Sequence, residues 1–377
     1  MAATVVRGDR RRRWALVLAV AAVLITVPLV VSARPVRVGG VEPLRLREAI
    51  LRSGSLPYQG YAEGNGTLGI PDLPNLDQVT SLLNGTTRVR SWYASPSSWR
   101  FDVLTAGAER DVYGTTNGEY VWDYGANLLT ELIGAQPVRL PRAGDLLPPD
   151  LARRVLAAAP NDPVSTLPSK RVAGLSAAGL RVRPADPDTS IGQVDIWADP
   201  ESGLPLQVEV TARGTDRPML VTRFVDLSLD APAPEILVPT RPADGGFSVT
   251  TAPDIVRELG VGAPVFFPDR LAGRSLSTSG LAGVPGAGLY GSGLSAFVVL
   301  PLPRNIGGSA TEAARKGGGT ELSLPGGTGV RLSIPPVSVI VERSTVARRS
   351  YLLAGLVDPA VLERAAAELS TAPRSGP

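Results

Sequence analysis

The sequence of 377 residues contains neither histidine nor cysteine, and it has only two lysines, Lys170 and Lys316. The absence of histidine and cysteine excludes Ser-His-Asp and Cys-His nucleophilic catalysis, zinc and haem sites built on those ligands, and disulfide bonds. It also excludes the cysteine through which a bacterial lipoprotein is anchored. The chemistry that remains is carboxylate catalysis or oxygen-ligand metal binding. The sequence therefore favours a protein that is not an enzyme and needs no cofactor.

The charge of the chain is concentrated near its N-terminus. The net charge is +3, and five arginines among residues 7–13, set against Asp9, already supply +4. The rest of the chain is close to neutral as a whole, so it lacks the basic character that nucleic-acid binding requires. We expect no nucleic-acid partner.

An uncharged and almost wholly apolar run, residues 14–31, follows the arginines at 10–13. Positive charge before such a run holds the N-terminus in the cytoplasm, so the rest of the chain is exported. The run reaches the length of a short membrane span, whereas Val31-Ser32-Ala33 has the spacing of a signal-peptidase site. Residues 1–33 are therefore a signal-anchor or a signal peptide. The first gives a single N-terminal span in the cytoplasmic membrane with an extracytoplasmic C-terminal region, and the second a secreted or periplasmic protein.

Strand patterns dominate residues 41–230, which we take as the first domain. Aromatic and aliphatic residues alternate with polar ones, as in the run from Trp99 to Val103, which is typical of strands buried on one face. A few helical patterns interrupt the strands, and this favours an α+β fold. The expected elements are a helix at 44–54, a strand at 58–70, helical turns at 76–83, strands between 86 and 133, a helix at 149–159 and a strand at 219–229.

A β-hairpin is predicted for VDIWADPESGLPLQVEV, residues 194–210. Residues 199–203 supply a tight turn with aspartate, proline and glycine. Apolar residues recur with a period of two, so they should share one face: Val194, Ile196, Ala198, Leu206, Val208 and Val210. The hairpin also carries Trp197, and its buried face could cover either a core or a ligand.

A proline-rich stretch without periodicity begins at residue 231. We place a linker at 231–250 and a small α+β C-terminal domain at 251–377. Strands are expected in that domain at 294–302, 337–342 and 351–355. A helix should follow, with Asp358 as its N-cap and Pro359 at its first position.

Two motifs have ordinary structural explanations. Residues 286–291, GAGLYG, match the glycine spacing of a dinucleotide-binding loop, but a strand pattern follows them where a helix is needed. Acidic groups such as Asp186, Asp188 and Asp195 stand beside proline or glycine in predicted turns, where aspartate is favoured for local reasons. Neither motif predicts a nucleotide, metal or catalytic site.

Aromatic side chains gather in one part of the chain. Ten of the nineteen lie between Tyr58 and Tyr124, and Trp197 should lie near them in the fold. Aromatic residues that fill the core between a sheet and its helices would explain this distribution. The alternative is a curved sheet that encloses an apolar cavity lined by some of them.

The order of these segments resembles a known group of exported proteins. A helix ending near YQG (residues 58–60), alternating strands and the hairpin WADPESGLPLQVEV resemble the LolA/LolB-like lipoprotein-binding fold and the RseB/MucB-like sigma-E regulatory proteins. The residues that carry most of the resemblance are Trp197, Asp199, Gly203, Leu204 and Pro205. Residues 351–369, YLLAGLVDPAVLERAAAEL, resemble the end of the second, smaller domain that RseB-like members add.

The resemblance implies a half-open antiparallel β-barrel with helices across its mouth, which would enclose an apolar cavity for acyl chains. The hairpin would then form part of the cavity wall. The candidate cavity residues are Trp92, Trp99, Phe101, Val103, Trp122, Trp197, Leu206 and Val208.

The function implied is that of an exported, membrane-associated regulator that binds lipid or lipoprotein and acts on an anti-sigma factor or envelope-stress sensor, without catalysis. Its partners would be the acyl chains of lipid or lipoprotein, a membrane-bound anti-sigma factor and the cytoplasmic membrane. The alternative is a LolA-like carrier of lipid or lipoprotein that works with an export system such as an ABC transporter.

Overall fold

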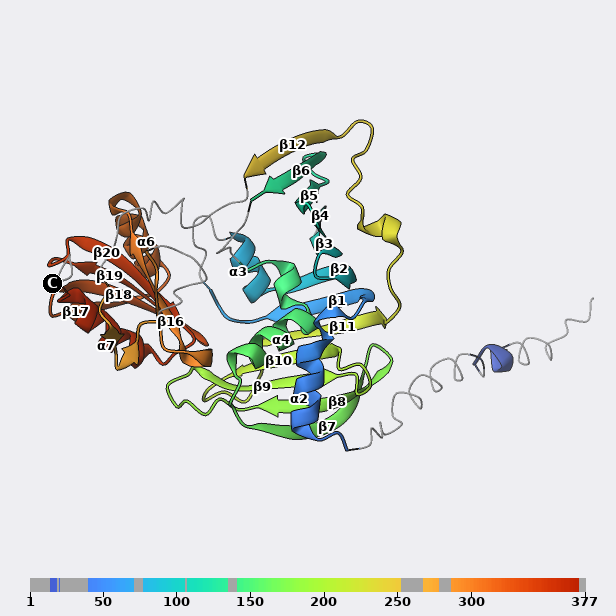
Figure 1. Cartoon of the computed structure of the whole chain (residues 1–377), viewed down its shortest axis with the longest axis horizontal. Coiled ribbons are helices and arrows are strands. Elements are labelled where there is room, and N and C mark those ends of the chain that lie inside the picture. Colours follow the sequence, from blue (N-terminus) through green and yellow to red (C-terminus); the bar gives the residue numbers. More distant parts are fainter. Residues whose placement is uncertain are drawn as a thin grey trace, which may run out of the picture.

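The computed structural model describes residues 14–18, 20, 40–70, 77–105, 107–134, 141–251, 267–277 and 286–372. These residues form two main β-sheets with a few helices packed on them, a mixed α+β fold (Figure 1). The larger sheet has twelve strands in the order β12-β6-β5-β4-β3-β2-β1-β11-β10-β9-β8-β7, and it does not close into a barrel. The smaller sheet has six strands in the order β15-β16-β20-β19-β18-β17. The predicted α+β class is confirmed.

The larger sheet is antiparallel except where β12 joins it. Its strands are β1 (Tyr58–Gly66), β2 (Thr86–Ser95), β3 (Ser98–Thr105), β4 (Ala108–Thr115), β5 (Gly118–Asp123), β6 (Leu128–Ile133), β7 (Val164–Val172), β8 (Leu175–Val182), β9 (Ile191–Ala198), β10 (Pro205–Ala212), β11 (Leu220–Ser228) and β12 (Gly246–Thr251). The elements packed on it are α2 (Pro43–Arg52), the 3₁₀ turn η1 (Ser53–Ser55), α3 (Asp77–Asn84), the 3₁₀ turn η2 (Ala143–Leu146) and α4 (Pro148–Ala158).

Helices α2 and α4 lie across β7 to β11 (Figure 1). The side chain of Glu42 accepts hydrogen bonds from the first free amides of α2, at Leu44 and Arg45, which is the usual stabilisation of a helix start. Leu46 of α2 and Leu156 of α4 are buried in one apolar core with strand residues such as Ile196. This core attaches both helices to one face of the sheet.

The side chain of Arg47, on α2, links this helix to the backbone at the C-terminal end of α4. It is buried, and its guanidinium donates to the carbonyls of Leu156, Ala159 and Asp162 at the C-terminal end of α4. A cation at this end of a helix meets carbonyls that have no partner within the helix, and it interacts favourably with the helix dipole.

The predicted hairpin is present as β9 and β10, with a turn organised by Asp199. Its carboxylate accepts from the backbone of Ser202 at 2.8 Å. The prediction is wrong for one side chain, Leu206. The strand register shifts between Pro205 and Gln207, and this β-bulge turns Leu206 away from the face that carries Val208.

The segment predicted as a linker contains regular structure. A 3₁₀ turn, η3 (Pro234–Leu237), packs against β3. Residues 246–251 then form β12, which pairs in parallel with β6. The edge of β6 offers unpaired backbone groups to a nearby extended segment. Pairing with this edge explains why β12 is a strand although its sequence has no strand periodicity.

The smaller sheet comprises β15 (Gly288–Tyr290), β16 (Phe297–Leu302), β17 (Thr320–Leu324), β18 (Gly327–Ile334), β19 (Val337–Ser344) and β20 (Arg349–Gly355). The predicted last helix is confirmed as α7 (Pro359–Ser370), with Asp358 as its N-cap. It covers the face that carries Ile340 and Leu353, and α6 (Arg304–Lys316) covers the opposite face. The short strands β13 (Arg270–Leu271) and β14 (Arg274–Ser275) and the 3₁₀ turn η4 (Gly293–Ser295) complete this part.

The loop that leads into β9 docks onto the smaller sheet. The hydroxyl of Thr189 donates to the carbonyls of Leu294 and Leu356, at 3.0 and 2.9 Å. The backbone amide of Ser190 also donates to Leu356, and the amide of Asp358 donates to Asp188. The two sheets are therefore joined by backbone hydrogen bonds as well as by the chain.

The predicted membrane segment falls mostly on residues outside the described part of the chain. Within residues 1–33 the structure describes a helical stretch at 14–18 and residue 20. Among the described residues, no helix is long and apolar enough to cross a membrane.

Candidate functional site

Three of the predicted cavity residues lie together on β3. Trp99, Phe101 and Val103 line a cavity of about 240 Å³, together with Tyr93 of β2 and Val112 of β4. Phe101 belongs to the same core as Leu46 and Leu156, so the cavity lies on the helix-covered face of the sheet. The turn η2 contributes Ala143 and Gly144 to the opposite wall.

Two glycines make room for the aromatic rings of this wall. The rings of Trp99 and Phe101 are stacked, with centroids 4.6 Å apart and an angle of 20° between their planes. A Cβ added at Gly114 would lie 2.1 Å from the Trp99 ring, and one at Gly144 would lie 2.5 Å from Phe101. Glycine at both positions therefore lets backbone lie directly against the two rings.

Charged side chains surround the cavity in ion pairs. Arg154 contacts Asp145 at 2.7 Å, and Arg142 contacts Glu119 of β5. Asp150 of α4 pairs with Arg153 at 2.7 Å. Burial raises the pKa of Asp150, and the neighbouring Arg153 lowers it by a smaller amount. The cavity thus combines an apolar wall with a polar rim, the arrangement that suits an amphiphile.

The hairpin residues do not reach this cavity. Val208 is fully buried in the core beneath α2 and α4. Trp197 and Leu206 lie in a separate cluster with Val172 and Ala177. The indole nitrogen of Trp197 donates to a backbone carbonyl at 3.1 Å. In this structure the hairpin therefore covers a core on one face and a small cluster on the other.

The other two tryptophans predicted to line the cavity, Trp92 and Trp122, also lie apart from it. Trp122 packs with Tyr113 and Leu129, and a Cβ at Gly245 would come within 3.0 Å of its ring. The guanidinium of Arg100 lies over the ring of Trp92, 5.1 Å from its centroid. Three of the eight residues predicted to line a cavity therefore lie together at one cavity, and the other five lie elsewhere.

Sequence reasoning missed two parts of the cavity, namely Tyr93 on the sheet and the opposite wall formed by η2. Tyr93 could have been found, because it shares the alternation of β2 and pairs with Trp99 in the sheet. Its hydroxyl donates to the carbonyl of Gly54 at 2.6 Å, and burial raises its pKa. The η2 residues carry no periodic signal, and only the folded chain places them opposite β3.

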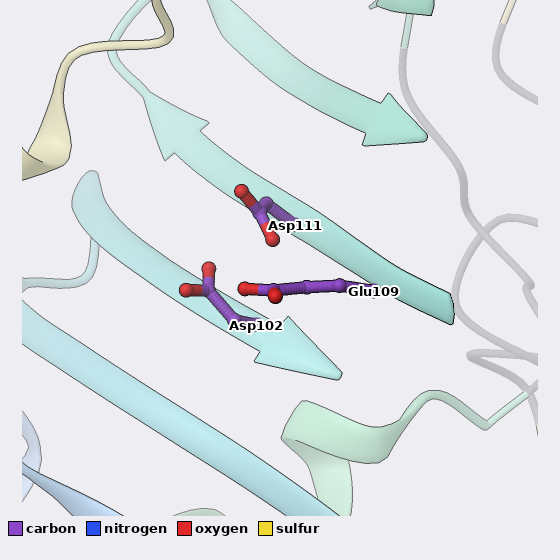
Figure 2. Close-up of side chains that lie close together, drawn as sticks. All are labelled: Asp102, Glu109 and Asp111. Carbon is purple, nitrogen blue, oxygen red and sulfur yellow. The ribbon is translucent and has the colours of Figure 1, made fainter. Parts of the chain in front are cut away.

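A cluster of acidic residues lies on the opposite face of β3 and β4. Figure 2 shows the carboxylates of Asp102, Glu109 and Asp111 close together, and one oxygen from each lies within 4.8 Å of the others. Asp102 and Asp111 are direct neighbours across the two strands, and both are 1% exposed. Arg100 donates to both oxygens of Asp102, at 2.6 and 2.9 Å, and to Asp111 at 2.8 Å.

The acidic cluster is best explained as a buried ion-pair network. Burial raises the pKa of Asp111 to about 7, with a further contribution from Asp102, while Arg100 opposes the shift. Carboxylates in this number could ligate a divalent cation. However, the Arg100 guanidinium already occupies both oxygens of Asp102 and one of Asp111. The hydrogen bonds of Arg100 link β3 to β4 on the face of the sheet opposite the cavity.

No protein-family model and no curated protein matches the sequence. Among solved structures, the Pseudomonas aeruginosa MucA/MucB complex is similar, with 18% identity over 86% of this chain and 95% of that chain, and a TM-score of 0.48. A LolA-superfamily protein from Nitrosomonas europaea has 12% identity, covers 53% of this chain and 99% of its own, and has a TM-score of 0.24. The Mycobacterium tuberculosis lipoprotein LppX has 11% identity, covers 50% of this chain and 95% of its own, and has a TM-score of 0.26. The structural neighbours thus include MucB and LolA-superfamily proteins.

Proposed function

We propose that this chain binds an acyl chain of a lipid or lipoprotein in the cavity beneath η2. The observation that supports the proposal most is the wall formed by Trp99, Phe101 and Val103, with paired charges at its rim. Burial of methylene groups there would contribute about 0.8 kcal/mol each. The volume of about 240 Å³ lies below the usual range of about 300–1,000 Å³ for ligand pockets, so one segment of acyl chain fits better than a whole lipid.

The wider role proposed is that of an exported regulator without catalytic activity. Its partner would be a membrane-bound anti-sigma factor or a similar envelope-stress sensor, in line with the resemblance of the sequence to RseB/MucB-like proteins. The smaller sheet would contribute protein contacts, since it is joined to the acyl-binding sheet through residues 188–190. Occupation of the cavity would then alter the surface offered to the partner.

The first prediction concerns Val103, which is half-buried in the cavity wall. Val103→Glu places a carboxylate where methylene groups would lie, and burying a charge beside them is costly. We expect the lipid bound per chain to fall about tenfold, equivalent to about 1.4 kcal/mol. The measurement is native mass spectrometry of the full chain, purified from a host membrane fraction in a neutral detergent, with identification of the released lipid.

Val225→Glu is the matched control. Val225 lies on β11 and is 47% exposed, so the same substitution there adds a charge without entering the cavity. Equal lipid occupancy in the two variants and the unaltered chain would contradict the proposed site.

If bound lipid weakens a complex with the extracytoplasmic segment of an anti-sigma factor, the protein is a regulator. If it passes lipid to an acceptor instead, it is a carrier.

A further inference from the structure

The smaller sheet carries a second, larger pocket. This pocket encloses about 740 Å³ between α6 and the strands β17 to β20. Strand register places one row of its lining side chains on a single face of the sheet, namely Ser323, Thr328, Arg343 and Ser350. Helix α6 packs beside this row, on Val330 and Val341. The floor of the pocket is therefore a line of hydroxyl groups with a guanidinium among them.

Positive charge dominates the walls of this pocket. Arg315 is ion-paired with Glu321 at 2.8 Å. Within the part of the chain that the structure describes, the guanidinium groups of Arg343, Arg348 and Arg349 have no carboxylate or hydrogen-bond partner. Three guanidinium groups gathered in one concavity without a counter-charge attract an anion, and the walls of a concavity strengthen that attraction.

Arg348 lies in the turn between β19 and β20, and Arg349 is the first residue of β20. Arg348 has a φ of 51°, a left-handed conformation that costs a residue with a Cβ roughly 1 kcal/mol or more. Glycine or asparagine would adopt this conformation more easily. Strain of this kind is often found at binding sites, and here it occurs in a residue that lines the pocket.

We propose that this pocket binds a phosphoryl group together with the polar part of the molecule that carries it. A phosphate presents several acceptor oxygens and up to two negative charges, which suits several guanidinium forks and hydroxyl donors better than a single carboxylate does. The volume exceeds what an inorganic phosphate needs and falls within the usual range for ligand pockets. The bearer is a phospholipid head group or a free phosphorylated metabolite.

This site is independent of the acyl cavity. The two lie on different sheets and are lined by different residues. Loss of phosphoryl binding would leave the acyl-chain proposal intact, and loss of acyl binding would leave this one intact.

The test compares the full chain in neutral detergent with the double variant Arg343→Gln, Arg348→Gln. Calorimetric titration with glycerol 3-phosphate and with inorganic phosphate at low salt probes the free source. Flotation with phosphatidylglycerol vesicles, against phosphatidylcholine vesicles, probes the lipid head group. Arg364→Gln is the control, because Arg364 is exposed on α7, which covers the opposite face of the sheet.

We expect at least one phosphorylated probe to bind, and the double variant to reduce its affinity about tenfold or more while Arg364→Gln leaves it unchanged. Binding of glycerol 3-phosphate supports a free metabolite, and binding of phosphatidylglycerol vesicles alone supports a head group. Absence of binding by every phosphorylated probe would overturn the proposal. An equal loss of affinity in Arg364→Gln would also overturn it.

Discussion

Single residues carry much of the unusual chemistry of this protein, and Glu342 is the clearest case. It lies on β19 with no exposed surface, and both carboxyl oxygens lack a hydrogen-bond partner among the described residues. Its neighbours on that face are apolar residues such as Ile340 and Leu353. Burial raises the pKa of Glu342 to about 8, so the side chain is protonated in the folded protein at neutral pH.

A pH dependence of stability follows from Glu342. The folded state keeps a proton that the unfolded chain releases above its own pKa of about 4.3. The stabilising effect is therefore complete below about pH 4, and it is lost as pH rises toward 8, by about 1.4 kcal/mol per pH unit. We expect Glu342→Gln to remove this contribution, as measured by denaturant unfolding between pH 5 and pH 9.

Glu321→Gln provides the comparison for this experiment, since the Glu321 side chain is 71% exposed. The change of slope in Glu342→Gln is judged against the change in this variant. Asp111, whose pKa is raised to about 7, contributes a slope of the same sign in all three proteins. An identical slope in Glu342→Gln and the unaltered chain would refute the assignment to Glu342.

At the scale of elements, the β9–β10 hairpin is fitted tightly against α2. Gly203 ends the turn with a φ of 76°, and a Cβ there would lie 2.6 Å from the backbone carbon of Ala49. Gly203→Ala therefore combines an unfavourable backbone conformation with a collision that only a shift of α2 can relieve. We expect a loss of about 2–3 kcal/mol in the free energy of unfolding.

Gly214→Ala separates these two effects. Gly214 has a φ of 79°, and a Cβ there would meet no atom within 4 Å. This variant should lose only the backbone contribution, about 1 kcal/mol. Denaturant unfolding of both variants measures the difference, and equal losses would show that the contact between the hairpin and α2 adds nothing.

Elements with local signals were predictable from the sequence, and those that depend on distant partners were not. The hairpin turn and α7 contain their own turn and capping residues, so the sequence located both. Helix α6 contains Gly307 and Gly308, which lower helix propensity, and it escaped prediction. Strand β12 is paired with the edge of β6, which lies far from it in the sequence. The same division applies to the site: alternation found Trp99, Phe101 and Val103, but not η2 opposite them.

At the scale of the whole molecule, the two sheets meet at a small polar interface centred on Arg274. Its guanidinium contacts Asp186 at 3.2 Å and Asp188 at 3.1 Å, and the Arg274 side chain is only 13% exposed. Burial alone would raise the pKa of Asp186. Hydrogen bonds from Ser295, the amide of Asp188 and Arg274 outweigh it and lower that pKa. The interface is therefore strongest when Asp186 is ionised.

The last prediction follows from that interface. Arg274→Gln removes the cation shared by Asp186 and Asp188, and we expect it to weaken the contact between the sheets by about 1–3 kcal/mol. Hydrogen exchange should quicken at the amides of Ser190 and Asp358, which bond across the interface, while exchange within each sheet stays slow. Arg270→Gln is the control, because among the described residues the Arg270 guanidinium donates only to the carbonyl of Gly273 within its own turn. Acid should act in the same direction as Arg274→Gln. The contribution of Asp186 is present above its unfolded pKa of about 3.9 and is lost as pH falls through its lower folded pKa. Unchanged exchange at Ser190 and Asp358 in Arg274→Gln would mean that the Thr189 hydroxyl and these two backbone bonds hold the sheets together without the Arg274 cation.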